Sequence, residues 1–441
     1  MKNSWPWVPV TDKSQAPDWL QDLAAYEQLF VGFSGGLDST VLLHRLSRHP
    51  GVIKKVTAVH INHGLSPNAS LWQDHCERLC KQWQVNFLAL SVHCDQRGNV
   101  EEAARVARYQ ALGALIKKNN CLLMGHHLDD QAETLLLHLF RGAGVDGLAA
   151  IPEKSSVGEG DLRRPLLSCT RQSLQAYALE HQLCFIEDES NTNTRFSRNF
   201  LRQDIFPLLK SRWPGVARNL ARTAEHCRLT QANLTDLAHL DCPSLAEKSR
   251  VLPLAPLLRL NRARLGNVLR TWLRQHDVRM PNTATFNRLM DEMILAAPDS
   301  NPEIHWQQVT IKRYQQHLYL LPSETGCIPI LPWTTFPNPL CFQGRGTLTA
   351  ETADEGLFIP SGSQLVIRFR EAGETFYWHG QNKSLKKLFQ EWKIPPWQRQ
   401  QIPLLYVDNQ LAAVIGYAIS DLFYQRRAGQ CYKLSHTIIN K

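Results

Sequence analysis

The chain has 441 residues, more than one ordinary hydrophobic core accommodates, so two or three domains are expected. With 43% hydrophobic and 20% charged residues, and its longest strongly apolar stretch confined to 411–419, the composition excludes disordered, fibrous and membrane proteins. Eleven cysteines without paired short spacings, and no apolar signal core near the N-terminus, favour a cytoplasmic protein with reduced thiols.

The net charge of +9 is unevenly distributed along the chain. Residues 1–214 carry +1, residues 215–325 carry +4, residues 326–360 carry −2 and residues 361–441 carry +6. The basic excess is consistent with a solvated surface that keeps the protein soluble. It is equally consistent with a polyanion bound by the downstream parts.

The first ~125 residues alternate short apolar runs with helical patterns. The runs rich in β-branched and aromatic residues predict strands at Leu29–Phe33, Val56–Asn62, Val85–Ser91 and Cys121–Gly125. The intervening patterns predict helices at Thr40–Leu46, Trp72–Gln82 and Glu101–Lys117. This alternation indicates an α/β fold, a Rossmann-like parallel sheet with helices on both faces and ligands at the carboxyl ends of its strands.

The remainder of the chain predicts smaller modules. Leucines at helical spacing over 201–295 predict a helical domain, and five prolines within Pro322–Pro339 predict an extended linker. Strands are expected at Leu365–Phe369, Leu404–Val407 and Leu411–Ile415, with Asp408-Asn409-Gln410 as a hairpin turn. The expected domains are catalytic at 1–214, helical at 215–322, a linker region at 323–360 and a small basic α+β domain at 361–441.

One loop follows the first predicted strand directly and leads into a helix. It reads Ser34-Gly35-Gly36-Leu37-Asp38-Ser39. Two glycines let backbone N–H groups approach a ligand, and the helix N-terminus that follows favours an anion such as phosphate. Asp38 would repel a bare phosphate, which suggests a bridging Mg²⁺ or a positioning role. The alternative is a tight strand–helix turn with a Ser or Asp cap.

A second polar string, Gly125-His126-His127-Leu128-Asp129-Asp130-Gln131-Ala132-Glu133-Thr134, follows the fourth predicted strand. On a helix, His126, Asp130 and Glu133 share one face, and Asp129 lies four residues before Glu133. Carboxylates packed this closely repel one another unless a bound Mg²⁺ or an incoming ammonium group neutralises them. The alternative is an acidic helix N-terminus that the helix dipole stabilises.

Two further patterns are weak. The string Gly142–Gly147 fits G-x-G-x-x-G but follows a predicted helix, whereas a dinucleotide site requires a preceding strand. The residues His60, His63, His75, Cys76 and Cys80 include spacings found among metal ligands, but they lack a CxxC pair and complete no tetrahedral zinc set. Neither pattern therefore predicts a site.

The first loop resembles the pyrophosphatase loop of the N-type ATP pyrophosphatase superfamily, and together with the GHHLDDQAET string it resembles the tRNA(Ile)-lysidine synthase family. Supporting strings are Glu101–Tyr109, Arg164–Leu167, Asp188–Asn191 with Arg198-Asn199, and the C-terminal run from Lys383 to Tyr406. The resemblance implies an α/β fold and an enzyme that uses ATP to adenylate the wobble cytidine of the isoleucine tRNA with a CAU anticodon. L-lysine then displaces AMP.

The resemblance also implies roles for individual residues. Mg²⁺ would be held by Asp38 with Asp130. The ATP contacts would be Ser34, Gly35, Gly36, Leu37, Asp38, Ser39 and, near adenine, His60. The catalytic group would be Asp38, Arg105, Arg108, His126, Asp129, Asp130 and Glu133. The tRNA contacts would be Lys386, Lys387, Arg399, Arg426 and Arg427. Which carboxylate binds lysine's ammonium groups stays open, as does whether His126 moves a proton or holds the adenylate phosphate.

Two other functions remain to be distinguished from lysidine synthesis. A related tRNA thiolase would also adenylate its substrate, although the thiolases that resemble this chain carry CxxC cysteines that are absent here. A non-catalytic RNA-binding protein could retain the nucleotide fold, but intact acidic residues at the loop argue against a decayed site. The sequence does not predict an oligomeric state.

Overall fold

The computed structural model describes residues 18–64, 66–92, 100–189, 193–297, 300–321, 330–342, 346–371 and 373–437. The chain divides into two compact units, Met1–Leu237 and Ala238–Lys441. The long helix α10 (Val216–Asp241) begins where the end of the catalytic domain was expected and continues past the boundary between the units. Among the described residues, no helix is both long enough and apolar enough to span a membrane.

The first unit contains the predicted alternation of strands and helices. Its strands are β1 (Gln28–Gly32), β2 (Val56–Asn62), β3 (Asn86–Ser91), β4 (Asn120–Leu123), β5 (Lys154–Val157) and β6 (Gly160–Arg163). Its helices before α10 are α1 (Asp18–Leu23), α2 (Leu37–Ser47), α3 (Ala69–Gln82), α4 (Val100–Leu115), α5 (Leu128–Phe140), α6 (Val145–Leu148), α7 (Arg171–Glu180), α8 (Ser197–Phe200) and α9 (Phe206–Arg212). The strands and helices predicted before residue 125 are confirmed within a few residues.

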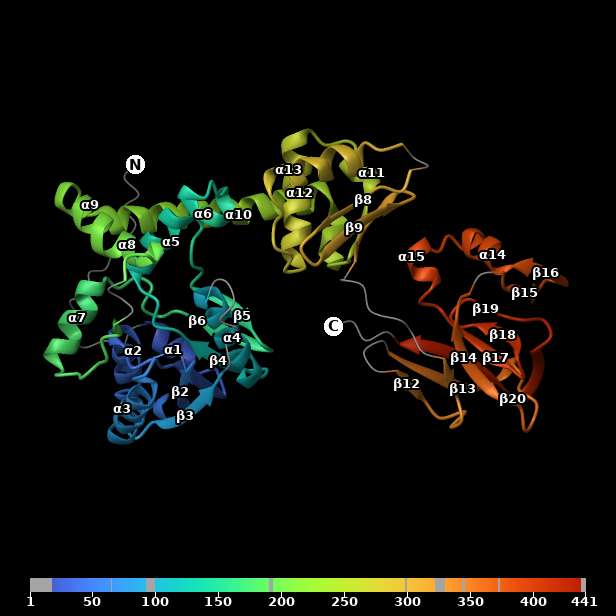
Figure 1. The fold of residues 1–441 in the computed structure, drawn as a ribbon, viewed down its shortest axis with the longest axis horizontal. Coiled ribbons are helices and arrows are strands. Elements are labelled where there is room, and N and C mark those ends of the chain that lie inside the picture. The colour runs from blue at the N-terminus through green and yellow to red at the C-terminus, as the bar shows by residue number, and fades with distance from the viewer. Residues whose placement is uncertain are drawn as a thin grey trace. The chain divides into compact units, whose positions relative to one another are not determined.

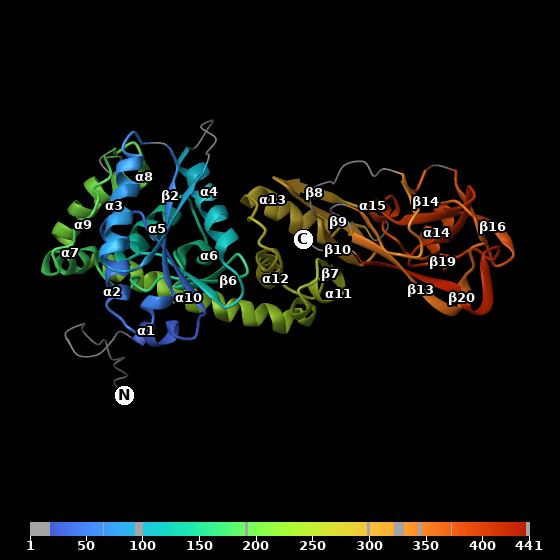
Figure 2. The same cartoon turned by 90° about the horizontal axis from the view of Figure 1, so that it is seen from below.

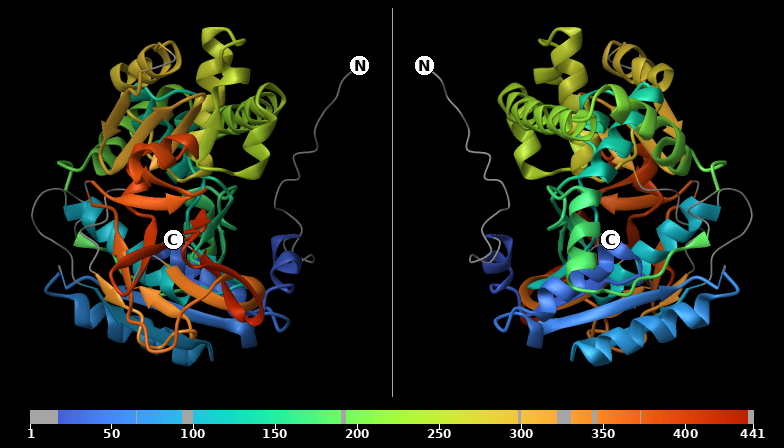
Figure 3. Two further views of the ribbon diagram at one scale, coloured as in Figure 1. Left: turned by 90° about the vertical axis from the view of Figure 1, so that its right-hand side faces the viewer. Right: turned by 90° about the vertical axis from the view of Figure 1, so that its left-hand side faces the viewer.

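The six strands form one sheet in the order β3-β2-β1-β4-β6-β5, parallel except for β5 (Figure 1). Alternate side chains of each strand face opposite sides, as the twofold period of a strand requires. Leu29, Val31 and Phe33 pack with α2, α3 and α7, whereas Leu122 and Met124 pack with α4 on the other face. Figure 2 shows α3 and α4 on opposite sides of β2, and both panels of Figure 3 show α3 (blue) beside β2 and β3.

The position of the site follows from the strand order. Strands β1 and β4 are neighbours in the sheet although β2 and β3 separate them in the sequence, so the direction of winding reverses between them. In parallel α/β sheets a ligand crevice opens at the carboxyl ends of two such strands. The loop 34–39 follows β1 and the GHH segment follows β4, so the fold brings both predicted motifs to this place.

Helices α8 and α9 are joined by a π-helical turn over Leu201–Ile205. Pro207, at the start of α9, has no N–H to donate to the preceding turn, which accounts for the irregular hydrogen bonding there. Leu201, Phe206 and apolar residues of α5 and α10 form a separate small core. This core fixes the π-helical turn against α5.

The second unit begins with helices and a four-stranded antiparallel sheet of order β7-β10-β9-β8. Its elements are β7 (Val251–Pro253), α11 (Leu254–Leu257), α12 (Arg262–Gln275), α13 (Thr283–Arg288), β8 (Glu303–Trp306), β9 (Val309–Tyr314) and β10 (His317–Leu321). The prediction of a helical domain was therefore incomplete. Trp272 of α12 packs with Ile311 and Leu318 of the strands in one core. The spacing of the leucines predicted the helices, but the strands are too short to give a clear pattern of their own.

The rest of the unit is mostly antiparallel β-structure. Its strands are β11 (Leu331–Pro332), β12 (Leu340–Phe342), β13 (Gly346–Leu357), β14 (Leu365–Phe369), β15 (Thr375–Trp378), β16 (Gln381–Ser384), β17 (Pro403–Val407), β18 (Gln410–Val414), β19 (Ala418–Ile419) and β20 (Tyr424–Thr437), with helices α14 (Leu385–Glu391) and α15 (Pro396–Arg399). The predicted turn is confirmed, because Asp408 and Asn409 both have positive φ, as a two-residue type I′ hairpin loop requires.

The segment predicted as a linker contains more structure than its prolines suggested. Residues 322–329 lie outside the described residues, but Trp333 and Phe342 are buried in the same core as β14 and β17. Proline is tolerated in short edge strands such as β11. Strand β13 then pairs with β20, so most of 330–357 belongs to the C-terminal domain.

Candidate active site

The loop after β1 is held in a shape that only glycine can adopt. Gly35 has φ +80°, and a Cβ there would lie 2.6 Å from Ile186 Cδ1 and 2.8 Å from Cys76 Sγ. The Ile186 amide donates to the Gly35 carbonyl at 2.8 Å, which fixes the loop from beneath. The neighbouring Ser34 is exposed to solvent. The loop is therefore a rigid turn whose outer side is open to a ligand.

The helix α2 begins at once after this loop. Gly36 precedes its first turn, and the Ser39 hydroxyl donates to the Gly36 carbonyl at 3.1 Å while lying 3.2 Å from the Ser34 hydroxyl. Thr40 Oγ1 donates to the Gly35 carbonyl from within the core. The first amides of a helix have no partner within it and attract anions. The serine hydroxyls and these amides together form a site suited to phosphate oxygens.

The segment after β4 comes into backbone contact with the loop. A Cβ at Gly125 would lie 3.1 Å from both the Asp38 carbonyl carbon and the Ser39 nitrogen, so any larger residue would press against the backbone of the loop. His127 then precedes α5, and its amide donates to Asp130 Oδ2 at 3.0 Å. The two predicted motifs thus form one site.

His127 lies at the centre of that site. Its imidazole is fully buried, with Nε2 3.6 Å from Asp38 Oδ2 and 3.5 Å from Asp130 Oδ2, and Nδ1 3.9 Å from Asp129 Oδ2. Neither ring nitrogen has a hydrogen-bond partner among the described residues. The sequence argument chose His126 instead, because helical spacing alone did not show which of two adjacent histidines faces the loop.

The acidic residues of α5 are paired with cations that the sequence argument missed. Asp129 accepts from Lys210 Nζ and from the Arg171 amide, both at 2.8 Å. Asp130 lies 3.3 Å from Arg202 Nη2. The mutual repulsion predicted for these carboxylates is therefore relieved by side chains of α9 and the π-helical turn, without any added cation.

Glu133 makes the strongest of these pairs. Its two oxygens accept from Arg202 Nε at 2.8 Å and Arg202 Nη2 at 2.9 Å, and Arg198 Nε lies 3.6 Å away. Arg198 also donates to Thr134 Oγ1 at 3.0 Å. The Arg198-Asn199 string pointed to this segment, and helical spacing from Arg198 to Arg202 is the one signal that could have revealed the second arginine.

Burial and charge set the ionisation of the four carboxyl groups in different directions. Burial raises the pKa of Asp38, and Asp130 nearby raises it further. Burial also raises the pKa of Glu133, even with Arg202 bound. For Asp129 burial acts in the same direction, but the Arg171 amide and Lys210 outweigh it and lower the pKa. Likewise His127 and Arg202 outweigh burial and lower the pKa of Asp130.

The comparisons with known proteins agree across the chain. Residues 10–209 match the PP-loop domain family, residues 252–319 the TilS substrate binding domain and residues 365–436 the TilS substrate C-terminal domain. A Legionella pneumophila protein named tRNA(Ile)-lysidine synthase is 50% identical over 94% of this chain and 96% of its own. The chain belongs to the tRNA(Ile)-lysidine synthase family. Lysidine synthases of Coxiella burnetii (38% identical; 92% of both chains) and Serratia proteamaculans (40%; 91% and 93%) are also similar.

Three residues expected in the lysidine synthase site lie outside the central cluster. His60 is buried, with Nδ1 3.0 Å from the Phe33 carbonyl and 3.5 Å from Cys76 Sγ, so the structure places its ring in the core below the loop. Arg105 and Arg108 are exposed on α4. The positive charge of Arg105 reaches His126, whose pKa falls to about 4, chiefly through burial.

The expected tRNA contacts of the second unit differ in exposure. Lys386 and Lys387 are exposed on α14, whose other face is buried, and Arg426 is exposed with Nε 3.0 Å from Glu355. The Arg427 side chain lies outside the described residues. Arg399 contradicts its prediction as a surface contact, because it is buried and donates to the Ile394 carbonyl at 2.8 Å. Arg399 is the last residue of the short helix α15, which turns its side chain inward.

The two weak patterns do not form sites in the part of the chain that the structure describes. No group of three histidine, cysteine or acidic side chains there is arranged to hold a metal ion, and the described cysteines carry free thiols. The string Gly142–Gly147 closes α5 rather than following a strand. Gly142 has φ +70° and its amide bonds to the Leu139 carbonyl, which is a left-handed helix terminus.

Proposed function

We propose that this chain ligates L-lysine to C2 of the wobble cytidine in the isoleucine tRNA with a CAU anticodon. The cytidine O2 attacks the α-phosphate of ATP and pyrophosphate leaves; the lysine amine then attacks C2 and AMP leaves. The observation that carries this proposal is the contact between the 34–39 loop and the carboxylates of α5 through His127, in a chain of the lysidine synthase family.

The loop supports binding of the ATP phosphates. Ser34, Gly35, Gly36, Leu37 and Ser39 would hold them through amides and hydroxyls at the start of α2, where the helix dipole favours negative charge. The side chain of His60 would not reach the nucleotide from its buried position. Its place beneath Phe33 supports the loop from the core.

The residues around Asp38 fit Mg²⁺ in one respect. Asp38 Oδ1 is buried without a hydrogen-bond partner among the described residues, and oxygen is the ligand atom that Mg²⁺ prefers. Asp130 could supply a second oxygen only in competition with Arg202. We therefore assign Asp38 as the principal ligand and Asp130 as the secondary one. When bound there, the ion would neutralise charge on the reacting phosphates.

The charge balance of the cluster supports a site for lysine's ammonium group. Four carboxylates, Asp38, Asp129, Asp130 and Glu133, face three cations, Arg198, Arg202 and Lys210, which leaves one negative charge. A single added cation restores neutrality. Because Asp129, Asp130 and Glu133 already hold close partners and Asp38 is assigned to Mg²⁺, an incoming ammonium group would displace one of these side-chain cations from its carboxylate.

The remaining predicted residues would act on the nucleotide being modified. Arg105 or Arg108 would contact its phosphate from the exposed face of α4. His126 is neutral near pH 7, since its pKa is about 4, and its buried Nδ1 has no hydrogen-bond partner within the described ranges. It can therefore accept a hydrogen bond from the amine or contact the adenylate, but it is a weak base.

The test of this function uses the full chain with ATP, lysine and an unmodified CAU-anticodon tRNA. We expect stoichiometric release of AMP and pyrophosphate, and a tRNA product heavier by one lysine residue. A thiolase would instead give a sulfur-for-oxygen exchange that requires a sulfur donor. Active ATP–pyrophosphate exchange without lysine incorporation would contradict the proposal, and binding without turnover would identify a non-catalytic protein.

The basic second unit would hold the body of the tRNA. Replacing Lys386 and Lys387 with alanine is expected to weaken tRNA binding about tenfold and to lower the slope of log affinity against log salt by about 2, one for each lost phosphate contact. The slope is measured by equilibrium binding from 50 to 200 mM salt.

The matched control replaces the exposed pair Lys117 and Lys118 of the nearly neutral first unit with alanine. An equal loss of tRNA affinity in this control would contradict the proposal that the second unit holds the body of the tRNA.

A further inference from the structure

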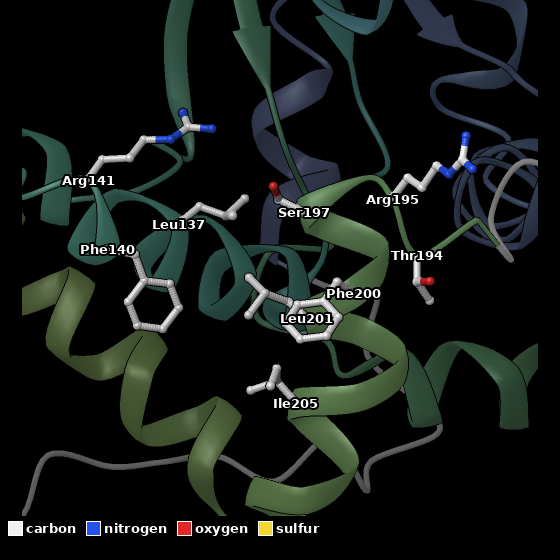
Figure 4. A pocket seen from close by; sticks show the side chains of 9 residues that line it. All are labelled: Leu137, Phe140, Arg141, Thr194, Arg195, Ser197, Phe200, Leu201 and Ile205. Carbon is white, nitrogen blue, oxygen red and sulfur yellow. The ribbon is translucent and has the colours of Figure 1, made fainter.

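A pocket of about 580 Å³ lies beside the proposed active site within the first unit. Figure 4 shows Phe140, from the end of α5, and Phe200, from α8, on opposite sides of it, with Ile205 of the π-helical turn between them. Although apolar, both rings are largely open to solvent: Phe140 is 69% exposed and Phe200 45% exposed. Because the two rings flank one pocket, they form an apolar surface that is accessible to a ligand.

The pocket and the carboxylate cluster are built on the same two segments. Leu137, which lines the pocket, lies one helical turn beyond Glu133 on α5, about 6 Å along the helix axis. Phe200 lies between Arg198 and Arg202, the two arginines that pair with Glu133. The pocket and the carboxylate cluster therefore depend on the same two helical segments.

The charges around the pocket select the kind of ligand. Among the described residues that line the pocket, Arg141 and Arg195 are charged and none is acidic. Figure 4 shows both guanidinium groups extending away from the apolar lining. Such a site repels lysine and Mg²⁺ and suits a flat apolar group attached to an anionic chain. Single-stranded RNA has this chemistry, because its bases stack on aromatic rings and its phosphates pair with arginine.

We propose that this pocket receives an unstacked base of the anticodon loop, a neighbour of the modified cytidine. The base lies between Phe140 and Phe200, and Arg141 and Arg195 contact its flanking phosphates. The inference rests on the proposed function, because it takes a single-stranded tRNA loop as the substrate. Binding of this base would make the enzyme specific, because it would determine which cytidine of the anticodon loop lies beside the carboxylate cluster.

A double-mutant cycle between protein and RNA tests the contact. One partner is the Phe140→Ala/Phe200→Ala variant, and the other is a series of full-length CAU tRNAs, each lacking one base of the anticodon loop. For wild type we expect one missing base to lower affinity about tenfold, equivalent to ~1.4 kcal/mol. The double variant should bind intact tRNA about tenfold more weakly than wild type does. Its affinity for the tRNA that lacks the critical base should fall no further, because the protein change and the RNA change remove the same contact.

The control is Leu179→Ala, which removes an apolar side chain that is 81% exposed on α7, away from the pocket, and should keep wild-type affinity. Additive losses at every loop position, or wild-type affinity in the double variant, would overturn the proposal. So would a raised KM for ATP, which would make adenine the occupant. Failure of the proposed function is seen separately, as absence of lysine incorporation by the wild-type enzyme.

Discussion

Replacing Asp38 with asparagine is expected to lower the rate of lysidine formation at least ~10³-fold and, at the same time, to stabilise the folded protein by about 0.5–2 kcal/mol. The loss of rate follows from the proposed role, because the amide cannot supply the negative oxygen that balances cations at the phosphates. The gain in stability follows from the site itself. Burial makes the ionised carboxylate unfavourable, and no hydrogen bond from the described part of the chain to Oδ1 compensates.

The pH dependence of stability gives this prediction a definite sign. The pKa of Asp38 is higher in the folded state than in the unfolded chain, so the folded state holds the proton more tightly. Its contribution to stability is present in full below the unfolded pKa and is lost as the pH rises through the folded value. The advantage of Asp38→Asn over wild type should therefore grow as the pH is raised from about 3 to neutrality.

The neighbouring Asp129→Asn substitution is the matched control. The pKa of Asp129 is lowered by Lys210 and the Arg171 amide, so its charge stabilises the fold above the unfolded pKa and that contribution fades as the pH falls. Asparagine at 129 should thus destabilise the protein where asparagine at 38 stabilises it. Urea unfolding at several pH values compares the two. Equal destabilisation by both would show that Asp38 serves the fold rather than the reaction.

The sequence was sufficient to predict the catalytic fold because the information there is local. Each of the strands β1 to β4 is a short apolar run that is followed by a helix, whereas β5 and β6 contain few apolar residues and were not predicted. Both motifs begin at the carboxyl end of a strand, so a parallel sheet brings them together once β1 and β4 are neighbours. The glycines at 35 and 125 carry the same signal, since each marks a place where a side chain would collide.

The partners of the site could not be predicted in this way, because they are remote in sequence. Lys210 and Arg202 lie about 70–80 residues after the carboxylates that they neutralise, on a segment whose own pattern reads only as helix. The buried positions of His60 and Arg399 also depend on tertiary packing. The sequence argument assigned His60 and Arg399 to ligand binding because they are polar and lie near a motif. In the structure, the side chains of both residues lie within hydrogen-bonding distance of backbone carbonyls.

The Arg202→Met substitution is expected to be the most destabilising change in this site. Glu133 is almost completely buried and Arg202 supplies both of its short hydrogen bonds. Methionine keeps the apolar part of the side chain but leaves a buried charge without its partner, which costs about 3–5 kcal/mol. Because the two units need not unfold together, the quantity to measure is the urea midpoint of the transition that reports the first unit.

The Glu133→Gln substitution added to Arg202→Met separates the charge from the packing. If the cost comes from the unpaired carboxylate, the double variant should recover most of the lost stability, because no buried charge remains. The destabilisation of the single variant should also shrink at low pH. Burial already raises the pKa of Glu133, and removing the guanidinium raises it further, so protonation relieves the penalty as the pH falls. A loss that is independent of pH and persists in the double variant would instead assign Arg202 a packing role between α5 and the π-helical turn.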